Sequence, residues 1–231
     1  MRNDRVLGVD ACKTGWVGVA LDGAEVSPYF AETIEELVTR AAAPGPLAVV
    51  AVDMPIGLPD QSTRQADLLA QQAVGNRLRS SVFTTPVHDA LDAPDHRTAT
   101  AINLARAGVG ISIQAFSLKP RLLKVQEWVH RTHYRVVEAH PEVSFVELAG
   151  APLDVGKKSW AGATRRCRLL ADAGIHLGDD LGEAGRQAAV DDVLDAAVCA
   201  WTARRVARGE ARSRPDQPEV FSDGLPCAIW S

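Results

Sequence analysis

The sequence contains few cysteines, few aromatic residues and no long hydrophobic run. Its cysteines lie far apart and form no Cys-x-x-Cys pair, which excludes the usual spacing of a zinc site and of a disulfide framework. No uncharged stretch approaches the roughly 18 apolar residues that span a bilayer, and Asp10 interrupts the first apolar run before it is long enough for a signal peptide. We therefore predict a cytoplasmic protein with reduced thiols and no membrane association.

An excess of positive charge is also missing. The formal net charge is −4, which argues against a protein that coats nucleic acid, because such binding neutralises phosphates with lysine and arginine. The hydrophobic share of 46% excludes a disordered chain. Basic residues are nevertheless concentrated locally, and each alone is explained simply as a solvated helix face. They are Lys119, Arg121, Lys124, His130, Arg131, His133 and Arg135, and then Lys157, Lys158, Arg165, Arg166 and Arg168.

The 231 residues contain no long polar linker, so we expect a single domain over 1–231. Residues 6–9 form an apolar run that predicts a buried strand ending at Asp10. Only three residues precede a second strand at 14–21, so the two strands must pair as a hairpin. The Asp22-Gly23 turn then predicts a third antiparallel strand at 24–30.

The chain then changes to alternating helices and strands. Thr33 and Glu36 predict a capped helix from about residue 34 to the alanines before Pro44, and the apolar run 47–52 predicts a parallel strand that ends at Asp53. Residues 60–133 show helical patterns and few strand signals, which indicates a helical insertion. A strand at 134–138 ends at Glu138, and helices are predicted at 141–148 and 160–173.

The last helix, predicted at 183–207, carries the strongest physical signal. Between residues 193 and 203 the only charged side chain is Asp195, so the helix must be largely buried. A buried carboxylate needs a partner, a shifted pKa or a metal ion. Small residues on the face of Asp192 and Asp195 would let this helix approach a sheet closely. Residues 218–230 predict a terminal hairpin.

Acidic residues from three segments could meet at one place. Asp10 and Asp53 end strands, where ligands of open α/β sheets gather, and Asp192 and Asp195 share a helix face. We predict that these four residues bind Mg²⁺ or Mn²⁺, which prefer oxygen ligands. Alone, Asp10 or Asp53 could equally cap a turn. Asp191 is more simply a solvated residue, and His140, near Glu138, a turn residue.

Several segments resemble domain-of-unknown-function family 429, which is described as predicted RNase H-like nucleases. The matching segments are Gly8-Val9-Asp10, Gly15-Trp16, 52–59, 80–83 with Pro86, 138–145, Lys157-Lys158 and 191–197. The resemblance implies an α/β fold of the ribonuclease H type, a mixed sheet of three antiparallel and then parallel strands flanked by helices. The Asp192-to-Ala196 segment also resembles RuvC-type Holliday-junction resolvases. The sequence departs from its family at Lys124 and Gln126, where acids are expected before Trp128.

The resemblance implies a nuclease that hydrolyses phosphodiester bonds with two divalent ions held by Asp10, Asp53, Asp192 and Asp195. Glu138 would be a further ligand or a base behind the ligands, and nucleic acid the partner. We expect phosphate contacts from Arg64, Arg77, Lys157 and Lys158. An inert binding module with this fold is an alternative, as is an actin-like phosphotransferase, which the chain length disfavours. A homodimer is left open.

Overall fold

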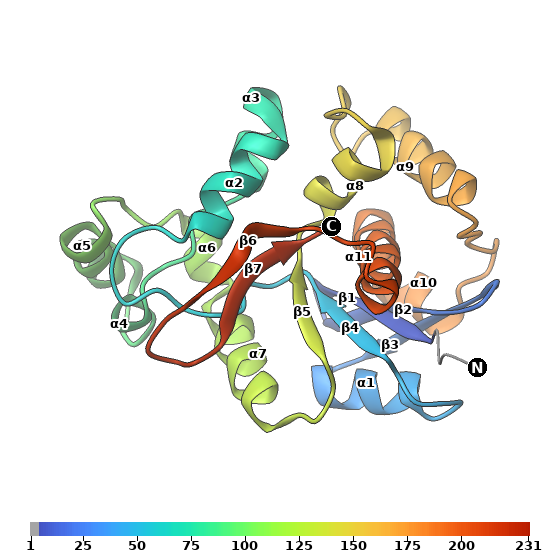
Figure 1. Cartoon of the computed structure of the whole chain (residues 1–231), viewed down its shortest axis with the longest axis horizontal. Coiled ribbons are helices and arrows are strands. Elements are labelled where there is room, and N and C mark those ends of the chain that lie inside the picture. Colours follow the sequence, from blue (N-terminus) through green and yellow to red (C-terminus); the bar gives the residue numbers. More distant parts are fainter. Residues whose placement is uncertain (1–4) are drawn as a thin grey trace.

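The N-terminal half of the sheet is an antiparallel meander, as predicted (Figure 1). The computed structural model describes residues 5–231. Strands β1 (Val6–Cys12), β2 (Gly15–Asp22) and β3 (Glu25–Ala31) pair in sequence order, and Asp10 lies opposite Val17. The turns at 13–14 and 23–24 are too short for any other pairing.

The remaining strands extend the sheet to the order β3-β2-β1-β4-β5-β7-β6. Strand β4 (Val49–Val52) is parallel to β1, β5 (Val136–Ala139) is parallel to β4, and β7 (Pro226–Trp230) is parallel to β5. The predicted ribonuclease H-type α/β fold, with antiparallel and then parallel strands flanked by helices, is confirmed.

The predicted C-terminal hairpin is also present, but its first strand is longer than expected. Strand β6 covers Ser213–Val220 and pairs antiparallel with β7. Its prolines at 215 and 218 obscured the strand pattern in the sequence. Prolines are tolerated here because β6 is the edge strand, where a missing N–H breaks few ladder hydrogen bonds.

Helices cover both faces of the sheet, and several lie in the segment between β4 and β5. In chain order the helices are α1 (Ile34–Ala42), α2 (Gln65–Ala73), α3 (Gly75–Leu78), a 3-10 turn (Arg79–Ser81), α4 (His88–Leu91), α5 (His96–Ala107), α6 (Ile113–Ser117), α7 (Lys119–Arg131), α8 (Pro141–Ala149), α9 (Trp160–Asp172), α10 (Gly182–Gln187) and α11 (Val190–Arg208). Among residues 5–231 none is long and apolar enough to cross a bilayer. The division into one domain with an insertion remains a prediction.

The prediction of one continuous helix over 183–207 was wrong. Helix α10 ends at Gln187, and α11 begins at Val190 after two residues of extended backbone. The carboxylate of Asp192 accepts the backbone N–H of Ala189 at 3.2 Å, which satisfies a donor that a helix start leaves open. An acid in the first turn thus begins a new helix instead of continuing the old one.

Strand alternation decides which side chains reach each face of the sheet. Val6 of β1 and Val49 and Ala51 of β4 pack on the side of α11, whereas Leu7 and Val9 pack on the side of α1 and α7. Figure 1 shows α8, α9 and α11 on one side of the sheet and α1 and α7 on the other. Because side chains alternate, the acids that follow the first set also face α11.

Helix α11 lies directly against β1 because Gly8 has no side chain. A Cβ atom at Gly8 would lie 2.0 Å from the backbone nitrogen of Ala200 and 2.2 Å from the carbonyl oxygen of Ala196. The small-residue face predicted for this helix therefore does allow a close approach to the sheet.

We predict that Gly8→Ala destabilises the protein more than Gly18→Ala does. At Gly8 the new methyl group meets helix backbone that cannot rotate away, and over-packing then costs about 1–3 kcal/mol or more. At Gly18 the nearest atoms are leucine side chains at 3.1 Å, which can shift. Urea unfolding of both variants measures the difference. Equal losses would contradict a backbone contact at Gly8.

Candidate metal centre

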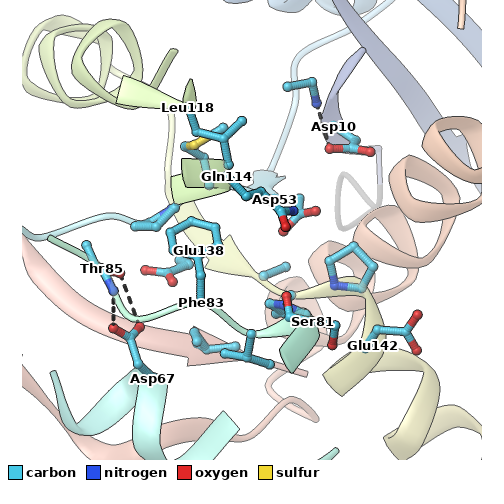
Figure 2. Close-up of a pocket in the computed structure, with 18 of the residues that line it drawn as sticks. Asp10, Asp53, Asp67, Ser81, Phe83, Thr85, Gln114, Leu118, Glu138 and Glu142 are labelled. Carbon is cyan, nitrogen blue, oxygen red and sulfur yellow. Dashed lines mark hydrogen bonds between the residues drawn. The ribbon is translucent and has the colours of Figure 1, made fainter. Parts of the chain in front are cut away.

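The carboxylates of Asp10, Asp53 and Asp195 lie together on the α11 side of the sheet. Each offers an oxygen atom, and these atoms all lie within 4.8 Å of one another, so the group could hold a metal ion. Asp10 lies two residues after Gly8 on β1, and Asp53 lies two residues after Ala51, just beyond β4. Each therefore faces the same side of the sheet as the residue two positions before it. Figure 2 shows both residues at the pocket, beside the ends of their strands.

Burial of these acids disfavours their charged forms. Asp195 is fully buried and Asp10 is 6% exposed. Burial is the largest cause that raises the pKa of Asp10 well above its usual value, and the nearby Asp53 and Asp195 add to it. Burial likewise raises the pKa values of Asp53 and Asp195 to about 7. Three acids that repel one another in a buried place are stabilised by any cation that joins them.

Lys157 supplies one positive charge at this group. It lies in the loop between α8 and α9, and its ammonium donates a hydrogen bond to Oδ2 of Asp195. Burial alone would lower the pKa of Lys157, but Asp195, Asp53 and Asp10 raise it instead. Lys157 is therefore charged at neutral pH and lies where the sequence analysis expected a contact to phosphate.

The second oxygen of Asp195 has no partner. Oδ1 is buried and makes no hydrogen bond to any residue of the described chain, 5–231. Buried carboxylate oxygens are normally satisfied, so an unpaired one next to two further carboxylates fits a ligand of a cation. Oxygen donors alone suit Mg²⁺ or Mn²⁺ better than zinc.

Asp192 lies beside this group without joining it. Its side chain is half-buried, and one oxygen is used to cap the start of α11 at Ala189. Its charge still contributes to the raised pKa values of Asp10 and Asp53. Direct metal binding by Asp192 thus remains a prediction. Asp191 precedes it and is partly exposed.

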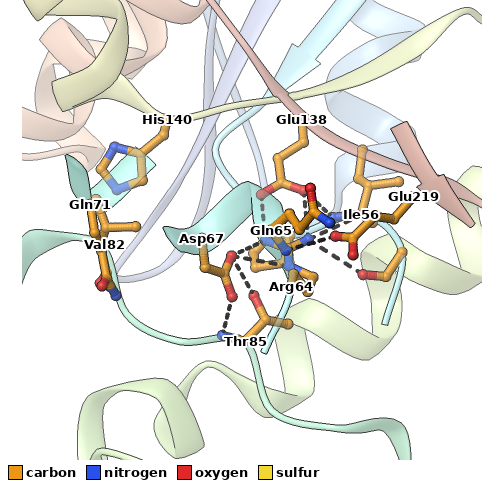
Figure 3. Close-up of polar contacts among 12 residues, drawn as sticks. Ile56, Arg64, Gln65, Asp67, Gln71, Val82, Thr85, Glu138, His140 and Glu219 are labelled. Atoms are coloured by element: carbon orange, nitrogen blue, oxygen red, sulfur yellow. Dashed lines mark hydrogen bonds and ion pairs between the residues drawn. The ribbon is translucent and has the colours of Figure 1, made fainter. Parts of the chain in front are cut away.

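Glu138 lies near the carboxyl end of its strand, as Asp10 does, but its side chain faces the other way. In the sheet it pairs with Val52, so its side chain has the parity of Val52 and points away from α11. In Figure 3 its carboxylate contacts Arg64. Two guanidinium nitrogens of Arg64 donate to the two Glu138 oxygens at 2.8 Å each, and the backbone N–H of Ile56 adds a hydrogen bond at 2.7 Å.

Arg64 is enclosed by this network. It is 1% exposed, and beyond Glu138 it donates to the carboxylate of Asp67, 3.0 Å from Nε. Asp67 in turn accepts the backbone N–H of Thr85 at 2.7 Å. As a phosphate contact, Arg64 would have to leave two buried carboxylates, so its predicted contact to phosphate stays a prediction that these ion pairs disfavour. Asp67 was not predicted as a site residue, because its only signal in the sequence is its position three residues after Arg64.

Gln126 holds the backbone of the segment that follows Asp53 by two hydrogen bonds. Its Nε2 donates to the carbonyl of Pro55 at 2.6 Å, and its Oε1 accepts the N–H of Gly57 at 3.2 Å. An acid at this position, as expected from the family, would lack the donor. The departure from the family pattern at Gln126 thus fixes the loop 55–57 from α7.

A pocket opens beside the three aspartates. Its volume is about 190 Å³, which is room for a phosphate group with part of a sugar but not for a duplex. Lys157 and Arg64 are among its lining residues, whereas Arg77 on α3 and Lys158 are exposed outside it. His140, predicted as a turn residue, precedes α8 and also lines the pocket, with Nδ1 buried and unpaired among the described residues.

Comparison with known proteins places the chain in one family. Residues 8–220 match the family described as "Protein of unknown function (DUF429)", and the chain belongs to it. No curated protein and no solved structure matches the chain. The family assignment therefore confirms the resemblance noted in the sequence, while nuclease activity is left to experiment.

We predict that Arg64→Met destabilises the protein by about 3–5 kcal/mol, because it leaves Asp67 and Glu138 buried without a counter-ion. The matched control is Arg77→Ala, an exposed position where a change within about 0.5 kcal/mol is expected. Chemical unfolding measures both. A stable, folded Arg64→Met protein would show that the network is not needed for folding.

We also predict a pH dependence of the metal-free protein. Between the ordinary pKa of 3.8 and the raised value of about 7, folded Asp53 and Asp195 hold protons that the unfolded chain releases. Their contribution to stability therefore falls as pH rises through this window. The melting temperature should be lower at about pH 8 than at about pH 5.5, and Mg²⁺ or Mn²⁺ should raise it more at the higher pH.

A matched variant separates this effect from other titrating groups. Burial lowers the pKa of His140, so this residue acts in the opposite direction. Asp195→Asn removes one raised pKa and leaves His140, and the fall in melting temperature between the two pH values should shrink. A melting temperature that rises with pH equally in parent and variant would contradict the prediction.

Proposed function

We propose that the protein is a divalent-metal-dependent phosphodiesterase that cleaves nucleic acid. The observation that carries the proposal is the buried group of Asp10, Asp53 and Asp195, with an unpaired Asp195 oxygen, beside a pocket at the carboxyl ends of β1 and β4. Ligands of open α/β sheets gather at this edge. The family resemblance to predicted RNase H-like nucleases supports the same reaction.

The three aspartates and Lys157 fit one divalent cation. Fully ionised, they carry a formal charge of −2, so a single Mg²⁺ or Mn²⁺ would balance the group. When bound, such a cation supplies Lewis acidity at a phosphoryl oxygen. The two ions implied by the resemblance would need a further negative ligand, for which Asp192 and the substrate phosphate are the candidates.

The other side chains hold the substrate and orient the acids. Lys157 lines the pocket with its ammonium and can donate to a phosphate oxygen while it remains beside Asp195. Arg64 and Gln126 fix the segment after Asp53 through hydrogen bonds to the carbonyls of Ile56, Gly57 and Pro55. We therefore assign Glu138, which holds Arg64, to positioning of this segment.

The alternative of an inert binding module is favoured by one observation. The ion pair between Lys157 and Asp195 already neutralises one acid without a metal ion. Titration with Mn²⁺ by calorimetry separates the two: binding that depends on Asp10 supports the metal centre, and no binding supports the inert module. The actin-like phosphotransferase gains no support from residues 5–231. Such enzymes need two domains that each begin with a hairpin, whereas the described residues form one sheet that begins with one.

Cleavage of a panel of DNA, RNA, hybrid and branched substrates with Mn²⁺ tests the proposal. Asp10→Asn and Asp195→Asn should each reduce the rate by about 100-fold or more, the equivalent of losing roughly 3 kcal/mol of transition-state stabilisation. Asp191→Asn is the matched control on the same helix and should retain activity. Asp192→Asn decides the role of that residue. Cleavage that survives both Asp10→Asn and Asp195→Asn would refute the mechanism.

A further inference from the structure

One tryptophan is largely exposed on the surface, three residues after Lys157 in the sequence. Trp160, the first residue of α9, is 87% exposed. By contrast, Trp16, Trp128 and Trp201 are 3%, 5% and 9% exposed. An indole left in water at the start of a well-capped helix contributes little to the fold, and its ring is accessible to a ligand.

Trp160 is tied to the centre through a short turn. Lys157, three residues earlier, donates to Asp195, and the backbone N–H of Ser159 closes the turn onto the carbonyl of Gly156 at 3.1 Å. Three residues of chain span at most about 10 Å. The Cα atom of Trp160 therefore lies within about 10 Å of the Cα atom of Lys157.

The surface around Trp160 is basic although the protein is acidic overall. Lys158, Arg165 and Arg168 are exposed, and none of them takes part in the ion pairs found among residues 5–231. Arg166 points the other way and pairs with Glu142 at 2.7 and 2.8 Å. Lys158 precedes Trp160 by two residues, whereas Arg165 and Arg168 lie more than one and more than two helical turns further along α9.

We propose that Trp160 stacks on an unpaired base of single-stranded nucleic acid while a neighbouring phosphate lies at the metal centre, with Lys158 on the backbone. The proposal rests on the function proposed above and names its substrate class. Proteins bind single strands with cations that contact the backbone and with exposed aromatic rings on which bases stack, because every base has a free π-face. A duplex keeps its bases stacked inside and cannot offer one.

The test compares two strands that differ only in their bases. Fluorescence anisotropy measures binding of a labelled oligothymidylate and of an abasic strand of the same length, with Ca²⁺ in place of Mn²⁺ so that binding is measured apart from cleavage. Trp160→Ala should weaken the base-bearing strand by about 5- to 100-fold and leave the abasic strand unchanged. Trp160→Phe should restore most of the affinity, since a phenyl ring still stacks.

Two controls separate stacking from charge and from general surface effects. Ile113→Ala, at a residue that is 75% exposed on α6, should change neither strand. Lys158→Ala should weaken both strands and lower the slope of log affinity against log salt by about 0.7. If Trp160→Ala weakens both strands equally or neither, the stacking site is refuted. Dissociation of a dimer by Trp160→Ala would refute it too, in favour of a protein contact.

The two proposals fail in different ways. If the parent protein binds the base-bearing strand through Trp160 but cleaves no substrate of the panel with Mn²⁺, the nuclease is refuted and the stacking site stands. If the parent cleaves single strands but Trp160→Ala binds them equally well, only the stacking site is refuted. A parent protein that binds neither strand at low salt and cleaves no substrate of the panel refutes both.

Discussion

The backbone contact between α11 and β1 is the constraint on which the site depends. Helix α11 touches the sheet at Gly8, close enough that no side chain fits between them. Asp10 follows Gly8 by two residues on β1, and the close approach of the helix places Asp195 next to it. Both carboxylates are thereby removed from water. The cost of burying these acids is offset by the apolar contacts that α11 makes with the strands, because the rest of the helix face is apolar. If α11 lay further from β1, the carboxylate of Asp195 would not lie near those of Asp10 and Asp53.

Strand alternation then determines which acids belong to the centre, and much of this could be read from the sequence. Asp10, Asp53 and Asp195 were predicted correctly as neighbours because two end buried strands and one interrupts an apolar helix. Glu138 also ends a strand, but its position relative to the apolar residues gives it the opposite parity. Because these strands are apolar on both faces, neither the direction of its side chain nor its partner could be read from the sequence. Arg64 reaches Glu138 across 74 positions of sequence, through long-range packing of a segment whose local pattern indicated only helices.

Other differences between the predicted and observed elements have local physical causes. The break between α10 and α11 follows from a carboxylate in the first turn of a helix, a signal that periodicity alone does not contain. The length of β6 was hidden by prolines that an edge strand tolerates. In both cases the pattern of apolar residues predicted that a helix or strand exists. Its ends were determined by polar side chains or by the backbone restrictions of proline. Such chemistry depends on neighbours that a single sequence does not reveal.

The buried ion pair of Arg166 links the group of three aspartates to the surface beside it. In the sequence, Arg166 belongs to a basic cluster and reads as a surface residue. In the structure it is fully buried, donates to Glu142 on α8, and contacts the Phe145 ring at 5.2 Å and the carbonyl of Val155 at 3.3 Å. It thereby ties α9 to α8 and holds the loop that carries Lys157. Because the same loop ends at Trp160, one buried arginine sets the position of both the ammonium at Asp195 and the exposed indole. A pair buried this deeply is retained at a cost in desolvation, which is consistent with a role in positioning.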